Sequence, residues 1–156
     1  MEIERKFLID SFPDNLICVK TAKVSQGYIS INPEIRIRSY EYDNFKEYVL
    51  TIKGDGNLSR DEVEIIITED KFNSISNMIR KPFIEKIYKQ YQLQNGLILE
   101  CSHVDDGSDS EFMYAEIEFK NEKEAVEFIV PDFLGREITE DSEYKMKNYW
   151  IAKNKN

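Results

Sequence analysis

The feature that most limits what this chain can fold into is the alternation of charged and apolar side chains in short segments. Side chains at positions i and i+2 lie on one face of a β-strand, so alternation predicts strands with one charged and one apolar face. Arg36-Ile37-Arg38 and Glu116-Ile117-Glu118 are two clear examples. Because such segments recur along most of the chain, we expect a domain dominated by β-structure.

Eight segments follow this alternation and are expected to be strands. They are residues 2–9, 22–31, 34–42, 46–53, 60–67, 83–92, 97–103 and 111–120. Turn residues separate them, and Asn95-Gly96 between the sixth and seventh is the best hairpin signal. Eight strands suffice to close an antiparallel barrel whose interior holds one small ligand. We therefore predict an eight-stranded antiparallel β-barrel tunnel with flanking helices, an all-β dominated α+β fold.

Three helices are expected beside the strands. Thr68 has the character of an N-cap, and apolar residues follow it at helical spacing as far as Ile79. Asn121 caps a second helix that is predicted to reach Phe128, and a third is predicted over residues 141–152. A chain of 156 residues suits one domain, so residues 1–156 are taken as a single unit.

Composition excludes several classes of protein. A formal net charge of −9 argues against a surface that tracks nucleic acid. The chain has no apolar run long enough to cross a bilayer, and its first residues do not resemble a signal peptide. Its two cysteines, Cys18 and Cys101, match no zinc motif and suggest a reducing compartment. We expect a cytoplasmic protein without nucleic-acid or membrane partners.

The charged faces are almost purely Arg, Lys and Glu. For a single strand, the simplest explanation is a sheet with one face in water. For the whole set, we favour charged faces that line the inside of a closed barrel, with apolar faces covered by helices or by a second subunit. A homodimer is compatible with that surplus of outward apolar residues. The inward set comprises the glutamates Glu2, Glu4, Glu62, Glu64, Glu100, Glu116 and Glu118 and the bases Lys6, Arg36, Arg38, Lys53, Arg60 and Lys86.

Enclosing so many charges is unfavourable unless a highly charged ligand or pairing compensates the loss of hydration. Arg and Lys form charge-assisted hydrogen bonds to phosphate oxygens. Glutamate oxygens suit Mg²⁺ or Mn²⁺, which bridge carboxylates and phosphates. Both signs of charge in one cavity therefore indicate a complex of divalent metal with polyphosphate.

The ordered motifs resemble the CYTH family, also called triphosphate tunnel metalloenzymes. Glu2-Ile3-Glu4-Arg5-Lys6 is similar to the family's ExExK signature, which alone is a weak pattern. Further matching segments follow in the family's order and cover nearly the whole chain: Gln26-Gly27-Tyr28, Arg36-Ile37-Arg38, Thr51-Ile52-Lys53-Gly54, Arg60-Asp61-Glu62-Val63-Glu64, Ala115-Glu116-Ile117-Glu118-Phe119 and Leu134-Gly135-Arg136-Glu137-Ile138-Thr139.

The resemblance implies roles for the inward residues and dependence on Mg²⁺ or Mn²⁺. Phosphate would be bound by Lys6, Arg36, Arg38, Lys53, Arg60 and Lys86. Metal would be bound by Glu2, Glu4, Glu116 and Glu118, with help from Glu62, Glu64 and Glu100. The residues expected to act most directly in catalysis are Glu4, Lys6, Arg60 and Lys86. Lys145 and Lys147 are further candidates if the last helix closes one mouth of the tunnel.

Two positions depart from the family's pattern. Tyr88 stands where many members carry an Arg, and Ser102 stands where many carry an Asp. One charge of each sign is lost, so the net charge of the inward faces is kept, while the contacts available to a substrate change. Arg80, Lys81 and Lys89 are the nearby bases that could compensate.

Hydrolysis of inorganic tripolyphosphate is the expected activity, because a short chain without a second domain has little obvious machinery for a nucleobase. Thiamine triphosphatase and adenylate cyclase are alternatives within the family, which the fold alone does not separate. A tunnel that binds polyphosphate or nucleotide without turnover is a further alternative, as is a sheet protein without a ligand.

Overall fold

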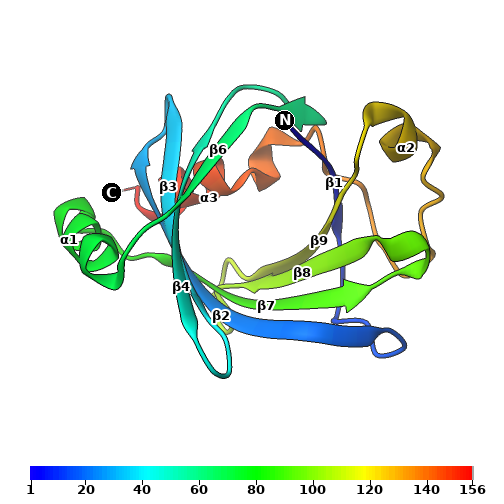
Figure 1. Ribbon diagram of the computed structural model, residues 1–156, viewed down its shortest axis with the longest axis horizontal. Helices are drawn as coiled ribbons and strands as arrows, with labels where there is room; N and C mark the ends of the chain where they lie inside the picture. Colours follow the sequence, from blue (N-terminus) through cyan, green and yellow to red (C-terminus); the bar gives the residue numbers. More distant parts are fainter. Residues whose placement is uncertain (156) are drawn as a thin grey trace.

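The computed structural model describes residues 1–155, and its strands curl into a barrel (Figure 1). The strands are β1 (Glu2–Leu8), β2 (Ile17–Ser30), β3 (Glu34–Glu41), β4 (Lys46–Lys53), β5 (Ser59–Arg60), β6 (Glu62–Ile66), β7 (Ile84–Gln92), β8 (Ile98–Val104) and β9 (Phe112–Glu118). The helices are α1 (Glu69–Ile79), α2 (Glu122–Glu127) and α3 (Met146–Lys153), with 3₁₀ turns η1 (Gln94–Gly96) and η2 (Ser142–Tyr144). The predicted antiparallel barrel with flanking helices is confirmed.

One segment closes the barrel, and it accounts for a ninth strand where eight were expected. The strand order is β5-β1-β9-β8-β7-β2-β3-β4-β6, so the two strands at its ends are neighbours in the chain. The predicted strand 60–67 is divided at Asp61: β5 places Arg60 opposite Glu2, whereas β6 places Glu62 opposite Lys53. Pairing with a different neighbour on each side requires an interruption, which the alternation of the sequence does not reveal.

Two other boundaries differ from expectation. Strand β2 begins at Ile17 rather than at residue 22, because its first residues pair with the end of β7, where Ile17 lies opposite Gln92. The predicted helix 141–152 consists of two parts, η2 and α3, which are separated at Lys145. Lys145 has the extended dihedral angles φ −68° and ψ 133°.

The other helices begin where their caps predict. The Thr68 hydroxyl accepts a hydrogen bond of 3.2 Å from the Lys71 amide at the start of α1. The Asn121 side chain accepts one of 2.8 Å from the Glu124 amide at the start of α2. Both contacts satisfy amides that have no partner within the helix.

The largest part of the apolar core lies outside the barrel wall, between the strands and the elements that cover them. The largest cluster joins the outward faces of β1, β8 and β9 to α2; its members include Ile3, Phe7, Leu99, Ile117 and Ala125. A second cluster packs Met146 and Trp150 of α3 against Tyr28, Ile84 and Ile138. Since Ile3, Phe7 and Leu99 point outward into the first cluster, the charged side chains that alternate with them point into the barrel. The second cluster lies on the inward side, because Tyr28 lines the cavity and Ile84 shares the face of Lys86 on β7.

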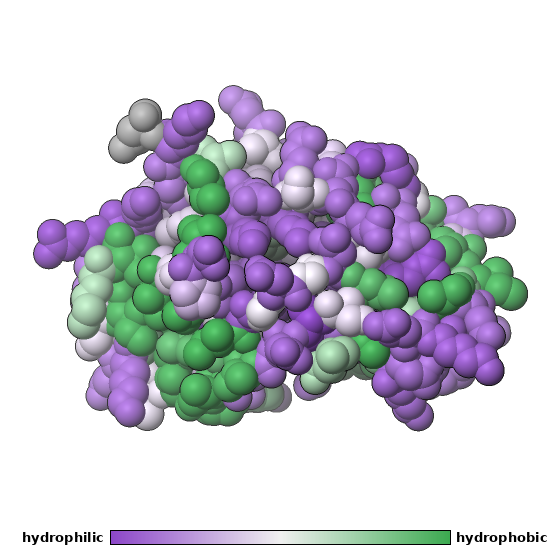
Figure 2. Space-filling model, turned by 90° about the horizontal axis from the view of Figure 1, so that it is seen from above, coloured by the Kyte–Doolittle hydropathy of each residue, from purple (hydrophilic) through white to green (hydrophobic). Residues whose placement is uncertain are grey.

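Some apolar surface remains exposed. Figure 2 shows apolar groups on the α1 side of the molecule and a smaller one on the α2 side. The exposed apolar residues include Val63, Ile65, Ile66 and Met78 on β6 and α1, and Val126 and Ile129 on and after α2. Among the described residues, no helix is long and apolar enough to cross a membrane.

Candidate active site

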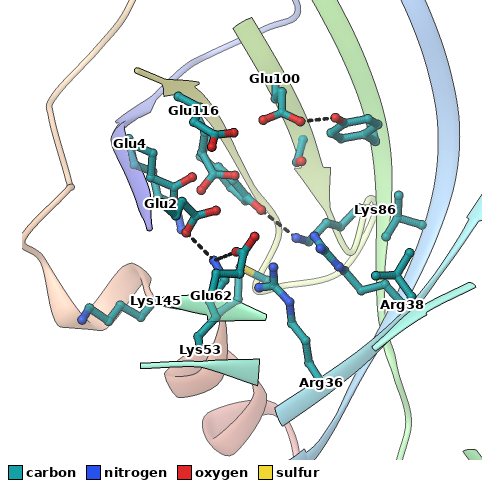
Figure 3. A pocket seen from close by; sticks show the side chains of 18 of the residues that line it. Glu2, Glu4, Arg36, Arg38, Lys53, Glu62, Lys86, Glu100, Glu116 and Lys145 are labelled. Atoms are coloured by element: carbon teal, nitrogen blue, oxygen red, sulfur yellow. Dashed lines mark hydrogen bonds and ion pairs between the residues drawn. The ribbon is translucent and has the colours of Figure 1, made fainter. Parts of the chain in front are cut away.

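The barrel encloses a cavity of about 320 Å³. All seven inward glutamates and all six inward bases predicted from the sequence line it. They come from strands around the entire wall, and Figure 3 shows the labelled carboxylates and cations pointing toward one another across the space. The inside-out arrangement expected from the alternation is therefore confirmed, whereas the chemical role of each residue remains a prediction.

Carboxylates are concentrated on β1, β9 and β8, which are neighbours in the sheet. The register places Glu4 opposite Glu118 and Glu100 opposite Glu116. Like charges directly opposite each other destabilise a sheet. Burial, together with the nearby Glu116 carboxylate, raises the pKa of Glu4 well above its usual range. Burial and Glu116 likewise raise the pKa of Glu100 to about 7. This acidic wall, formed by the glutamates of β1, β8 and β9, therefore carries like charges whose repulsion a cation would reduce.

Three cations lie on β3 and β7 (Figure 3); β7 is the neighbour of β8 in the sheet, and β2 separates it from β3. Arg36 and Arg38 follow each other on the inward face of β3, and Lys86 projects from β7. Burial, followed by the nearby Arg36, lowers the pKa of Lys86 well below its usual range. The Nε atoms of both arginines are buried and have no hydrogen-bond partner among the described residues. This basic wall, Arg36, Arg38 and Lys86, therefore has donors available for an anion.

A third part of the lining is already paired. Lys53 Nζ lies 2.8 Å from Glu2 Oε1 and 3.4 Å from Glu62 Oε2. Arg60 lies 3.8 Å from Glu2 and 3.3 Å from Glu34, and Arg38 lies 3.5 Å from Glu64. Glu34 was missed in the sequence because it begins its strand beside Pro33. It shares the inward parity of Arg36, which would have identified it.

The segment before α3 reaches the cavity. Lys6 Nζ donates a 2.7 Å hydrogen bond to the Tyr144 carbonyl and lies 4.1 Å from the centroid of the Tyr114 ring. Lys145 lines the cavity, and its Nζ donates to the Gly56 carbonyl at 3.2 Å. Trp150 of α3 is buried in the core. The last segment of the chain thus combines packing with a contribution to the tunnel lining.

The two departures from the family pattern face each other. Tyr88 lies opposite Ser102 in the β7–β8 register, and both line the cavity. The Tyr88 hydroxyl donates to Glu100 and accepts a 2.7 Å hydrogen bond from Gln90 Nε2. The positive charge that Tyr88 lacks and the negative charge that Ser102 lacks therefore belong to neighbouring positions of the sheet. The prediction that Lys89 compensates for the charge missing at Tyr88 is wrong. The Lys89 Nζ lies 4.5 Å from the centroid of the Phe12 ring, and Lys89 is not part of the cavity lining.

Arg80 and Lys81 do not compensate for Tyr88 either. Both are exposed at the end of α1, where Arg80 caps the helix with φ 55°, and neither is part of the cavity lining. Their place in the sequence suggested proximity to β7. The outward position of α1 directs them to solvent instead.

The charged side chains without an ion-pair partner show whether the cavity suits a metal ion and a polyanion. Within residues 1–155, the ion pairs include neither Lys6, Arg36 and Lys86 nor four of the carboxylates, Glu4, Glu100, Glu116 and Glu118. Divalent hard cations take carboxylate oxygens as ligands, and phosphate oxygens accept from Arg and Lys. The donor set therefore fits both groups, since it offers carboxylate oxygens to a metal ion and cationic N–H donors to phosphates.

We expect the metal-free protein to become more stable as the pH falls from 8 toward 5. A carboxyl whose folded pKa is about 7 and whose ordinary value is 4.5 binds its proton more tightly in the folded state. Protonation of Glu100 then contributes on the order of 3 kcal/mol to the free energy of unfolding as the pH drops through 7, and the gain ends near 4.5. Urea denaturation in the presence of a chelator measures this slope.

Glu100→Gln is the matched variant for that titration. It removes the titrating group, so its stability should change less between pH 8 and pH 5 than that of the wild type. The lowered pKa of Lys86 acts in the opposite direction at alkaline pH in both proteins, and the difference between them isolates Glu100. Equal slopes in the two proteins would show that Glu100 does not titrate in this range.

Comparison with known proteins supplies independent evidence. No protein-family model matches the sequence. The inorganic triphosphatase of Nitrosomonas europaea is 36% identical over 149 residues, which cover 94% of each chain. The inorganic triphosphatase of Acetivibrio thermocellus is 34% identical over 153 residues, covering 94% of this chain and 91% of the relative.

Solved structures agree with these relatives. A crystal structure of an inorganic triphosphatase superposes with a TM-score of 0.68 at 32% identity and covers 97% of this chain and 95% of that one. A putative adenylyl cyclase from Hippeastrum, 17% identical with a TM-score of 0.52 over 81% of this chain and 83% of its own, shares the fold. With its charged tunnel and these full-length relatives, this chain belongs to the CYTH family of triphosphate tunnel enzymes, the family of the inorganic triphosphatases.

Proposed function

We propose that this protein hydrolyses inorganic tripolyphosphate with the help of Mg²⁺ or Mn²⁺. The observation that carries the proposal is the set of charges without ion-pair partners: the buried Arg36 and Lys86 share one cavity with four carboxylates, Glu4, Glu100, Glu116 and Glu118. A protein without a ligand would gain nothing from this arrangement, because each enclosed ion loses several kcal/mol of hydration. The names of the full-length relatives support the choice of substrate.

In this proposal the basic wall holds the substrate. Arg36 and Arg38 donate to phosphate oxygens from β3, and Lys86 donates from β7. Lys53 and Arg60 extend the cationic surface, although carboxylates already neutralise part of their charge. Lys6 can donate to a phosphate in exchange for its contact with the Tyr144 carbonyl. Guanidinium groups suit this role because they bind phosphate with two parallel hydrogen bonds.

The acidic wall holds the metal. Glu4, Glu116 and Glu100 are the central ligands, with Glu2 and Glu118 beside them. Glu62 lies next to Glu2, since both carboxylates contact Lys53 Nζ, and Glu64 lies on the same strand, β6. When bound, the metal would polarise the triphosphate and lower the pKa of a coordinated water. The chain itself aligns the phosphates, limits access of bulk water, and places Lys86 and Arg60 near the oxygens on which charge develops. Phosphoryl transfer depends mainly on such positioning and charge stabilisation.

Release of phosphate tests this function. We expect release from tripolyphosphate with Mg²⁺ or Mn²⁺, slower release from ATP and thiamine triphosphate, and none in the presence of a chelator. Formation of pyrophosphate and cyclic nucleotide from ATP would identify a cyclase instead. Absence of phosphate release, together with thermal stabilisation by tripolyphosphate and metal, would replace the enzyme with a binding protein. In that case Tyr88→Arg combined with Ser102→Asp is the variant that should restore turnover.

The cellular setting and the oligomeric state complete the proposal. The reaction is placed in the cytoplasm, in keeping with Cys18 and Cys101, which are both free thiols. A homodimer through the exposed apolar residues of β6 and α1 remains our prediction. Sedimentation equilibrium measures it directly, and a monomer over the micromolar range would contradict it.

A further inference from the structure

Tyr88 and Gln90 follow Lys86 on the inward face of β7, and all three residues line the cavity. The register with β8 places Gln90 directly opposite Glu100, whereas Tyr88 lies opposite Ser102, one inward position away. Residues on such a diagonal are about 7–8 Å apart, which is within the reach of an aromatic side chain. The Tyr88 hydroxyl can therefore contact Glu100 from the neighbouring strand.

The hydroxyl of Tyr88 lies between an amide and a carboxylate. Gln90 Nε2 donates a 2.7 Å hydrogen bond to this hydroxyl, which itself donates to Glu100 Oε1, the contact drawn beside Glu100 in Figure 3. An amide nitrogen only donates, and a phenol has a single proton, so that proton is directed to the carboxylate. Gln90 thus fixes the direction in which the Tyr88 hydroxyl points.

Packing holds the Tyr88 ring in place. The residue is 8% exposed and lies in a small apolar cluster with Ala22 and Val24. The Tyr40 ring meets it edge to face, with the two centroids 5.8 Å apart. A hydroxyl on a ring that is fixed by packing can hold its acceptor in one orientation.

Glu100 is held by one of its two carboxylate oxygens. Oε1 accepts from Tyr88, whereas Oε2 forms no hydrogen bond and no ion pair with any residue from 1 to 155. Glu100 lies opposite Glu116 in the β8–β9 register, and both residues line the cavity. The acidic wall therefore contains a carboxylate with one oxygen fixed by a neutral donor and one oxygen available to a cation.

We propose that Tyr88 is a positioning residue that orients Glu100 as a ligand of the divalent metal ion, with Gln90 fixing the direction of the Tyr88 hydroxyl. The inference rests on the proposed function, which assigns Glu100 to the metal. Groups that hydrogen-bond to a metal ligand fix its orientation, and their loss weakens metal binding by about 10- to 100-fold. The tyrosine thus supports the metal site at a position where many members of the family carry an arginine.

Tyr88→Phe tests the inference through metal binding rather than turnover. It keeps the ring and the contact with Tyr40 and removes only the hydroxyl that holds Glu100. The probe is Mn²⁺ alone, titrated into the metal-free full chain while free Mn²⁺ is measured by electron paramagnetic resonance. We expect the dissociation constant for Mn²⁺ to rise by about 10- to 100-fold.

Tyr40→Phe is the matched control. It also removes a hydroxyl from the cavity lining, but the Tyr40 hydroxyl forms no side-chain hydrogen bond within residues 1–155. Its dissociation constant for Mn²⁺ should equal the wild-type value. An equal rise in the two variants would overturn the inference, because it would show a general effect of hydroxyl loss on the tunnel.

A double-mutant cycle shows whether Tyr88 acts through Glu100. If it does, adding Tyr88→Phe to Glu100→Gln should leave the dissociation constant of Glu100→Gln for Mn²⁺ unchanged. A merely structural role would instead weaken Mn²⁺ binding by the same factor in both backgrounds. That result would overturn the inference, as would wild-type affinity in Tyr88→Phe.

Failure of the proposed function gives a different pattern. If Glu100→Gln binds Mn²⁺ as tightly as wild type, Glu100 is not a metal ligand and the inference falls with that assignment. If Mn²⁺ binding depends on both Tyr88 and Glu100 but wild type releases no phosphate from tripolyphosphate, the proposed function fails and the role of Tyr88 stands.

Discussion

Glu4→Gln should lower kcat/KM for tripolyphosphate by on the order of 10²–10³ while the protein remains folded. Glu4 lies on the acidic wall within the influence of Glu116, and its raised pKa reflects burial and this neighbouring carboxylate. The amide keeps the shape of the side chain but removes the negative charge that a divalent cation needs. We therefore also expect the metal concentration for half-maximal activity to rise.

The same substitution should stabilise the metal-free protein. It removes one charge from a group of carboxylates that repel one another, so the melting temperature in chelator should increase. Glu127→Gln is the control, since Glu127 is exposed at the end of α2 and away from the cavity lining. Wild-type kinetics in Glu4→Gln would remove Glu4 from the metal site. Lost activity combined with a lower melting temperature in chelator would indicate a structural role instead.

Lys86→Met should have a comparable effect from the basic wall. Lys86 is buried beside Arg36 and Arg38, its pKa is lowered by burial and by Arg36, and its Nζ donates a 2.7 Å hydrogen bond to the Tyr114 hydroxyl. Methionine has a similar length without the charge. We expect a loss of about 10²–10³ in kcat/KM and the loss of thermal stabilisation by tripolyphosphate with metal.

Without ligand, Lys86→Met should be more stable than wild type, since it removes a buried cation that lies beside Arg36 and has no ion pair within the described residues. Lys89→Met provides a control on the same strand, because Lys89 points outward over the Phe12 ring. Its kinetics should match the wild type. Full activity in Lys86→Met, or equal losses in the two variants, would contradict the assignment of Lys86 to the substrate.

Much of the fold was predictable because strand alternation is local. A charged face and an apolar face are determined by every second residue, so Arg36-Ile37-Arg38 defines its own inward and outward sides wherever the strand lies. The helix starts at Thr68 and Asn121 were predictable for the same reason, since an N-cap acts within three residues. These local rules located the charged lining and the flanking helices.

The boundaries that were wrong depend on distant partners. The break at Asp61 exists because one segment pairs with β1 on one side and with β4 on the other. The early start of β2 depends on the end of β7. Partners far apart in sequence leave no periodic pattern in either segment.

The sequence by itself determined which residues of each strand share the charged face and that the charges have both signs. Only the tertiary structure decided how those charges divide. Lys53 and Arg60 both lie within ion-pair distance of Glu2, whereas Lys86, Arg36, Glu4 and Glu116 have no ion pair among the described residues. The physical reason is that the face on which a side chain lies depends on the spacing of residues along one strand. The ion pairs that the side chain forms depend instead on the order and register of strands around a closed sheet.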